Sequence, residues 1–147
     1  MNLIIDDDLA ATDADHYLMT HTTNPLLSSE TITHAVAQYQ TARSSNKADS
    51  LFGVTKFQTR FYKGDGTPIN HDPDNLIRTQ DLEPWYEENS CIYIFDKNSF
   101  ASTKARIGRK PILFEIPKLE SIDIDEKEDW FLVNVVAQGR MQESNYA

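Results

Sequence analysis

Two aspartates near the C-terminal end of the chain, Asp123 and Asp125, are the residues whose type and spacing most directly suggest chemistry. The surrounding segment, 120–125, alternates polar and apolar residues, which predicts an extended strand. Side chains alternate between the faces of a strand, so Asp123 and Asp125 share one face while Ile122 and Ile124 enter the core. Two carboxylates aimed together at a strand end suit a hard divalent cation, Mg²⁺ or Mn²⁺. The spacing therefore predicts a metal site and, with it, phosphate chemistry.

The same segment also has a purely structural interpretation. Asp125 and Glu128 have the spacing of a capping box, and apolar residues that follow fit one face of a helix over about 126–137. Acidic side chains there favour the positive end of the helix dipole. A cap accounts for Asp125 but does not require Asp123, so both interpretations stay open.

The composition is that of a globular chain with an acidic balance. The 147 residues are 39% hydrophobic and 25% charged, with a formal net charge of -9. A chain of this length normally forms a single domain, here 1–147. The acidic excess argues against nucleic acid as a partner. We expect a cytoplasmic location and no membrane partner, because no apolar run approaches the ~20 residues of a membrane span and the N-terminal residues lack the positive flank of a signal peptide.

Neither a disulfide nor a zinc site is expected. The single cysteine, Cys91, lies in an apolar run, which predicts a small buried side chain rather than a reactive thiolate. The four histidines have no zinc-like spacing among themselves or with Cys91; they are His16, His21, His34 and His71.

The hydrophobic pattern predicts alternating strands and helices. Strands are expected at 16–20, 51–57, 91–95 and 111–116, and helices at about 28–40, 97–104 and 126–137. An inserted arm, 57–88, contains a glycine hairpin turn at 64–66 and a long irregular stretch. The pattern predicts an α/β sheet that carries an inserted hairpin arm.

Four blocks, in order, resemble the cytidylyltransferases that activate sialic acids. Residues 22–26 are similar to that family's Pro-Thr-Ser-Pro-Leu loop, and 78–82 with 88–93 resemble its Arg-x-Gln-x-Leu and Glu-Asn-Gly-x-Ile-Tyr signatures. Residues 106–108 then precede the acidic segment 120–125, much as in the family. The resemblance implies a partial Rossmann-like nucleotide-diphosphosugar transferase sheet with a dimerisation arm. It also implies transfer of CMP from CTP to a sugar acid.

The resemblance assigns roles to individual residues. Asp123 and Asp125 would hold Mg²⁺ or Mn²⁺. The sugar-acid pocket would include His21, Arg78, Asn89 and Tyr93. Arg78 could reach a partner subunit, and a homo-oligomer is expected. Two positions depart from the family: His21 stands where a glutamine commonly faces the sugar, and Ser90 replaces the usual glycine.

A larger departure concerns the nucleotide. The family begins with a strand and a glycine- and basic-rich loop that holds the CTP phosphates, and this chain has no Gly-x-Gly cluster before a helix except the turn at 64–66. We therefore expect the chain to represent the C-terminal portion of such an enzyme and to be inactive alone. Candidate cations for the site are Lys56, Arg60, Lys63, Arg78, Arg106 and Arg109.

Two other functions stay open. The chain could be a catalytically inactive remnant, serving as an oligomerisation or sugar-acid-binding module through its arm. A third hypothesis is a phosphatase, in which an Asp-x-Asp pair at 6–8 or 123–125 would provide the nucleophile. The second pair leaves only 22 residues after Asp125, too few for the remainder of that fold, and the first lacks the threonine that usually follows.

Overall fold

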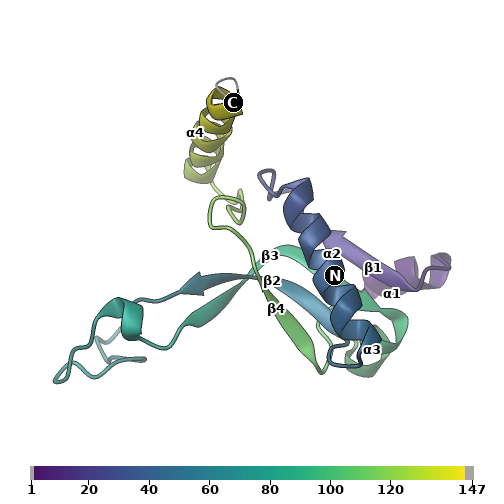
Figure 1. The fold of residues 1–147 in the computed structure, drawn as a ribbon, viewed down its shortest axis with the longest axis horizontal. Coiled ribbons are helices and arrows are strands. Elements are labelled where there is room, and N and C mark those ends of the chain that lie inside the picture. The colour runs from purple at the N-terminus through teal and green to yellow at the C-terminus, as the bar shows by residue number, and fades with distance from the viewer. Residues whose placement is uncertain (1, 145–147) are drawn as a thin grey trace.

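A mixed four-stranded sheet forms the centre of the molecule. The computed structural model describes residues 2–144, and the side chains of residues 3–142. The strands are β1 (His16–Thr20), β2 (Ser50–Phe57), β3 (Trp85–Asp96) and β4 (Pro111–Glu115). They lie in the order β1-β3-β2-β4, with β3 antiparallel to both neighbours and β4 parallel to β2 (Figure 1). Strands β1 and β4 are therefore the two open edges of the described sheet.

Three of the four helices in the described residues cover the two faces of this sheet. The four are α1 (Asn2–Ala11), α2 (Ser29–Ser44), α3 (Lys97–Thr103) and α4 (Lys127–Ser144). Helix α2 packs on one face, where its buried Ala35 and Tyr39 join Leu51, Ile92 and Ile94 in one apolar cluster. Helix α4 stands clear of the sheet (Figure 1).

The opposite face is covered by α1 and α3. Their Ile5, Leu9 and Phe100 are buried with Tyr93 and Phe95 of β3 in a second cluster. Strand β3 thus has neighbours on both sides and a helix layer on both faces. Its residues 91–96 are all buried, which explains why this strand reads in the sequence as a continuous apolar run.

These elements confirm the predicted alternation of strands and helices. The hydroxyl of Ser28 accepts a hydrogen bond from the N–H of Thr31 at 3.1 Å and caps α2, as the sequence indicates. Strands β2 and β4 lie within one residue of their expected bounds, whereas β3 extends further at both ends. The sequence does not predict α1, whose buried pair, Ile5 and Leu9, stands in a strongly acidic segment.

The acidic segment differs from its prediction. Residues 120–125 form no strand, and the expected alternation is absent, since 122–124 are all half-buried and Asp125 is exposed. Just upstream the chain turns, because the N–H groups of Glu120 and Ser121 donate to the Pro117 carbonyl, at 2.7 and 3.2 Å, and do not join the ladder of β4. The segment instead hydrogen-bonds to the loop after β1.

Helix α4 is capped by Asp129, and the assignment of the cap to Asp125 is wrong. The Asp129 carboxylate accepts hydrogen bonds from the N–H of Asp125 at 3.1 Å and of Glu126 at 2.9 Å. Because α4 begins at Lys127, Asp129 is its third residue, and this is the returning half of a capping box. The cap therefore uses the backbone of Asp125 and leaves its exposed carboxylate to solvent.

A bulge in β3 interrupts the central ladder. The register pairs residue 52 with 93 and residue 54 with 88, so Gly53 alone faces the four residues 89–92. Within the bulge Ser90 has a φ of 59°, in the left-handed region that favours glycine. A serine there carries backbone strain that a glycine would not.

The buried side chain of Asn89 stabilises this bulge with two hydrogen bonds. Its Nδ2 donates to Thr55 Oγ1 at 3.1 Å, and its Oδ1 accepts from the Cys91 N–H at 3.3 Å. A Cβ on Gly53 would lie 2.7 Å from Asn89 Oδ1 and 2.6 Å from Ile116 Cδ1. The absence of a Cβ at Gly53 thus leaves room for the Asn89 side chain.

Strands β2 and β3 continue past the sheet as a ribbon that leads into the arm (Figure 1). At its tip Gly66 has a φ of 86° and donates to the Lys63 carbonyl at 2.9 Å, which confirms the glycine turn. The arm exposes the aromatic side chains of Tyr62, Trp85 and Tyr86. Its use in dimerisation stays a prediction.

We expect Gly53→Ala to destabilise the protein by about 1–3 kcal/mol, because the new methyl group would overlap two packed side chains. Gly139→Ala is the matched control, since nothing lies within 4 Å of its added Cβ and alanine favours a helix. Urea unfolding of both variants measures the difference. An unchanged midpoint for Gly53→Ala would show that the bulge does not need glycine opposite it.

Candidate functional site

Tyr93 is the centre of a polar cluster beside the bulge. Its side chain is fully buried, and its hydroxyl donates to Glu88 Oε1 and lies 3.2 Å from Ser90 Oγ. The Arg106 guanidinium stacks on the ring, with Cζ 3.9 Å from the ring centroid and Nη2 3.3 Å from the same Glu88 oxygen. The cation–π contact and the charged hydrogen bonds fix the orientation of the ring.

The phenol of Tyr93 stays protonated at neutral pH. Burial, and next the hydrogen bond with Glu88, raise the pKa of Tyr93 to about 12. The bulge makes this contact possible, because residues five apart on an unbroken strand point to opposite faces. The Tyr93 hydroxyl is thus a hydrogen-bond donor throughout the physiological range.

His21 lies next to Tyr93, just beyond the end of β1. The two ring centroids are 6.3 Å apart. Among the described residues, His21 Nε2 is buried and has no hydrogen-bond partner. Such a group needs water or a ligand to offset its desolvation. His21 also borders a cavity of about 390 Å³ between β1 and α1.

The acidic segment runs beside the loop that follows β1. The Ile124 N–H donates to the Thr23 carbonyl at 2.9 Å, and Asn24 Nδ2 donates to the Ile122 carbonyl at 3.3 Å. These bonds join the first and last blocks of the resemblance, 22–26 and 120–125, which lie about a hundred residues apart in the chain.

The two metal candidates have different surroundings. Asp123 Oδ1 is buried and, within the part of the chain that the structure describes, has no hydrogen-bond partner. Burial, and next the charge of Asp123, raise the pKa of the Cys91 thiol to about 12. Cys91 is a buried, protonated thiol, as the sequence predicts. Asp125 is exposed.

The structure does not bring Asn89 and Arg78 to the Tyr93 hydroxyl. Asn89 uses its amide for the bulge, in the contacts with Thr55 and Cys91. Arg78 lies on the arm, where its 77% exposed side chain pairs with Asp81 at 2.7 Å. Within one chain, the structure places His21 beside Tyr93 and joins the acidic segment to the loop after β1 at Thr23 and Asn24.

Sequence reasoning missed the role of Glu88 and understated that of Arg106. Glu88 opens the block 88–93, and Arg106 opens the block 106–108, so both stand at the start of quoted motifs. Their contact with Tyr93 depends on a bulge that no hydrophobic period reveals. The one local signal in the sequence is position 90, where the resembled signature has a glycine; the structure gives Ser90 a φ of 59° there.

The residues present fit a magnesium ion that is held mainly by substrate and water. No group of three or more His, Cys, Asp or Glu side chains within residues 3–142 is placed to hold a metal ion. Mg²⁺ commonly binds through one or two carboxylates together with substrate phosphates and waters. The partnerless buried oxygen of Asp123 provides such a carboxylate, and Asp125 follows two residues later.

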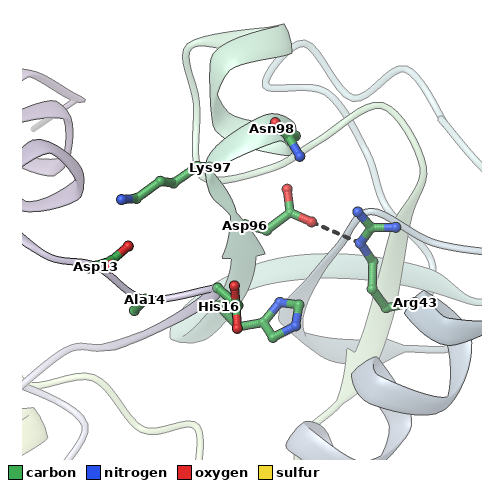
Figure 2. Close-up of a pocket in the computed structure, with 8 residues that line it drawn as sticks. Asp13, Ala14, His16, Arg43, Asp96, Lys97 and Asn98 are labelled. Atoms are coloured by element: carbon green, nitrogen blue, oxygen red, sulfur yellow. Dashed lines mark hydrogen bonds and ion pairs between the residues drawn. The ribbon is translucent and has the colours of Figure 1, made fainter.

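A further cavity, of about 450 Å³, lies at the other end of β1 (Figure 2). Its Asp96 carboxylate is already used, because it accepts from Arg43 Nε at 2.8 Å and from the Ser99 N–H at 2.7 Å. These bonds join the end of α2 to the start of α3. The polar groups here serve the fold, and none of the predicted site residues lines this cavity.

Comparisons with known proteins agree with this description. No family model matches the chain. The chain is 26% identical, over 124 residues, to an N-acylneuraminate cytidylyltransferase of Streptococcus agalactiae serotype V, and 26% identical over 128 residues to that of serotype III. Each match covers 82% of this chain, which spans about 30% of the length of these relatives. The resemblance to this family is thereby confirmed.

A solved structure shows the same fold. It is the 4-diphosphocytidyl-2C-methyl-D-erythritol synthase of Anaerococcus prevotii, with a TM-score of 0.62 and 15% identity. The match covers 93% of this chain and 66% of that one. The predicted Rossmann-like α/β fold is therefore confirmed. In addition, no helix among residues 2–144 is long and apolar enough to cross a membrane.

Glu120 anchors the acidic segment to α2 and should give stability a pH dependence. Burial acts to raise the pKa of Glu120, but hydrogen bonds from Ser28 and Thr31 and the charge of Arg140 outweigh burial and hold it below 4.5. A carboxyl group whose pKa is lower in the folded than in the unfolded state stabilises the fold at pH values above its unfolded-state pKa. This stabilisation is lost as the pH falls through its folded-state pKa.

We expect Glu120→Gln to lower the free energy of unfolding at pH 7, with the difference from wild type shrinking as pH falls below about 4.5. Denaturant unfolding across this range measures it, with the exposed Glu115→Gln as control. A difference that stays constant with pH would contradict an ionised, hydrogen-bonded Glu120.

Proposed function

We propose that this chain is the acceptor- and metal-binding part of a cytidylyltransferase that transfers CMP from CTP to a sialic-acid-like sugar acid. The observation that supports it most is convergence at the β3 bulge. The blocks 22–26 and 120–125 hydrogen-bond to each other, and Ser121 accepts from Thr55, which in turn accepts from Asn89 in the block 88–93. Arg106, from a further block, stacks on Tyr93.

The polar cluster suits an acidic sugar. The Arg106 guanidinium provides positive charge in a chain of net charge -9, where a sugar carboxylate would otherwise be repelled. His21 Nε2 offers a buried polar atom that a sugar hydroxyl could satisfy. Tyr93, held by Glu88 and Arg106, forms a rigid wall between these groups. Arg78, on the arm, would add a cation only from a partner subunit.

Asp123 and Asp125 would hold Mg²⁺ or Mn²⁺, with CTP phosphates and water completing the coordination. A metal bound there neutralises charge on the phosphate oxygens as the sugar hydroxyl displaces pyrophosphate. The cap formed by Asp129 would leave Asp125 available as a metal ligand, because it orders the backbone of Asp125 without using the Asp125 carboxylate.

A second candidate function is an oligomerisation or sugar-acid-binding module without catalysis. The exposed aromatic side chains of the arm favour it, since such apolar surface is typical of an interface. A homodimer through the arm is part of both proposals, and a clean monomer in light scattering would contradict it. The cytoplasmic location also stays a prediction.

We expect Asp123→Asn to abolish binding of Mn²⁺ in calorimetric titration, with little loss of stability, because the buried Asp123 Oδ1 has no hydrogen-bond partner among the described residues and α4 keeps its Asp129 cap. Glu128→Gln is the control, because it removes an exposed charge from the same segment and changes neither the proposed ligands nor the Asp129 cap. Undiminished Mn²⁺ binding by Asp123→Asn would remove the metal assignment.

We also expect the 147-residue chain alone to release no pyrophosphate from CTP in the presence of Mg²⁺ and acidic nine-carbon sugars. Its glycines provide no loop to hold the triphosphate, and orientation accounts for up to about 7–11 kcal/mol of such a barrier. The assay is repeated with the nucleotide-binding portion of a Streptococcus agalactiae relative supplied in trans. Robust turnover by the chain alone would contradict the proposed division of the site.

A further inference from the structure

Ser90 keeps a side chain at a position where the backbone favours glycine. Three residues other than glycine have a positive φ among the described residues: Asn46 at 56°, Ser90 at 59° and Lys104 at 54°. Lys104 is the C-cap of α3, and Asn46 follows the C-cap of α2, where a left-handed residue commonly ends a helix. Ser90 lies inside β3, so no helix end accounts for it. A glycine would adopt this φ without strain, and the serine side chain is therefore the feature that needs an explanation.

The Ser90 hydroxyl belongs to a chain of hydrogen bonds that runs in one direction. Glu88 is paired with Arg106, with 3.3 Å between Oε1 and Nη2, and a carboxylate only accepts hydrogen bonds. The Tyr93 hydroxyl has one proton and donates it to this Glu88 oxygen. Ser90 Oγ lies 3.2 Å from the same hydroxyl, so in this contact Ser90 donates its proton to Tyr93.

The direction of this chain decides what Ser90 can offer to a ligand. Burial and Glu88 raise the pKa of Tyr93, whereas the contact with Ser90 acts to lower it, as a donor to the phenol oxygen would. Once its proton is used, the Ser90 oxygen has only lone pairs left. It can accept a hydrogen bond from a ligand but cannot donate one.

Ser90 also stands where a ligand can reach it. The residue is half-buried and is paired in neither ladder of β3, because the ladder with β1 ends at Ile92 and the register with β2 omits 89–92. The Tyr93 ring that it contacts is also beside His21, whose buried Nε2 has no partner among the described residues. Two polar groups with unused hydrogen-bonding capacity thus adjoin the same ring.

We propose that Ser90 is a specificity-determining residue of the sugar-acid pocket, and that its hydroxyl oxygen accepts a hydrogen bond from a hydroxyl or N–H group of the sugar. This role of Ser90 rests on the function proposed above. A carbonyl, carboxylate or phosphate oxygen placed there would face the lone pairs of Ser90 and leave both groups without a donor. The carboxylate of the sugar would therefore bind elsewhere in the pocket.

The test titrates the full 147-residue chain with N-acetylneuraminic acid, followed by NMR. Analogues that each lack one hydroxyl or N–H donor are titrated alongside it. We expect one analogue to bind the wild-type protein about three- to tenfold more weakly, which is the loss that accompanies one neutral hydrogen bond. Fluorine in place of the missing group should restore nothing, because fluorine cannot donate.

Two variants of Ser90 separate contact with the sugar from an effect on the backbone. Ser90→Ala removes the hydroxyl and keeps the strain, whereas Ser90→Gly removes both, so Ser90→Gly should have the higher urea midpoint. We expect both to bind N-acetylneuraminic acid about three- to tenfold more weakly than wild type, and neither to lose further affinity for the weakly bound analogue. Asn46→Gly is the control, because it relieves a similar φ and leaves the Tyr93 cluster intact.

Three results would overturn the role of Ser90. Equal binding by Ser90→Ala and the wild-type protein would do so and leave the proposed function standing. Recovery of wild-type binding in Ser90→Gly, with weak binding in Ser90→Ala, would do so as well, because binding would then follow the backbone and not the hydroxyl. Absence of saturable binding by the wild-type protein would contradict the proposed function itself, and the role of Ser90 with it.

Discussion

The bulge in β3 opposite Gly53 is the constraint on which the rest of the site depends. Asn89 closes it by bonding Thr55 and the backbone of Cys91, and the missing Cβ of Gly53 leaves room for that amide. Without the bulge, Glu88 and Tyr93 would point to opposite faces of β3. With it, the same short block both completes the core on the α2 side and presents a phenol on the α3 side.

Several contacts follow from this one irregularity. Thr55, which Asn89 holds, donates to Ser121 Oγ at 3.2 Å, so the bulge is joined to the acidic segment. That segment is in turn tied to the loop after β1, and its Glu120 accepts from the Ser28 N–H at the start of α2. The elements that carry chemistry are thus connected by hydrogen bonds between loops rather than by the sheet ladder. The geometry of the site therefore depends on these hydrogen bonds between loops.

Those features of the fold that depend on hydrophobic periodicity and on capping residues could be predicted from the sequence. The strands, the Ser28 cap and the glycine turn of the arm follow from local patterns, and the block order indicated the family. The sequence-based prediction was wrong or incomplete where contacts between distant parts of the chain determine the local structure. Residues 120–125 have the alternation of a strand, yet no strand pairs with them, and the acidic start of the chain concealed α1. Glu88 and Arg106 meet Tyr93 only because the bulge reverses the faces of β3, which spacing alone cannot reveal.

We propose that the bulge, the loop after β1 and the acidic segment form one metal-dependent site. Anomalous diffraction from crystals grown with Mn²⁺ tests it directly. We expect a peak at about 2.1 Å from Asp123 Oδ1, on the side of Asp125, with water filling the other positions. A peak at the aspartates 6–8 of α1 or in the cavity of Figure 2, with none at Asp123, would contradict it.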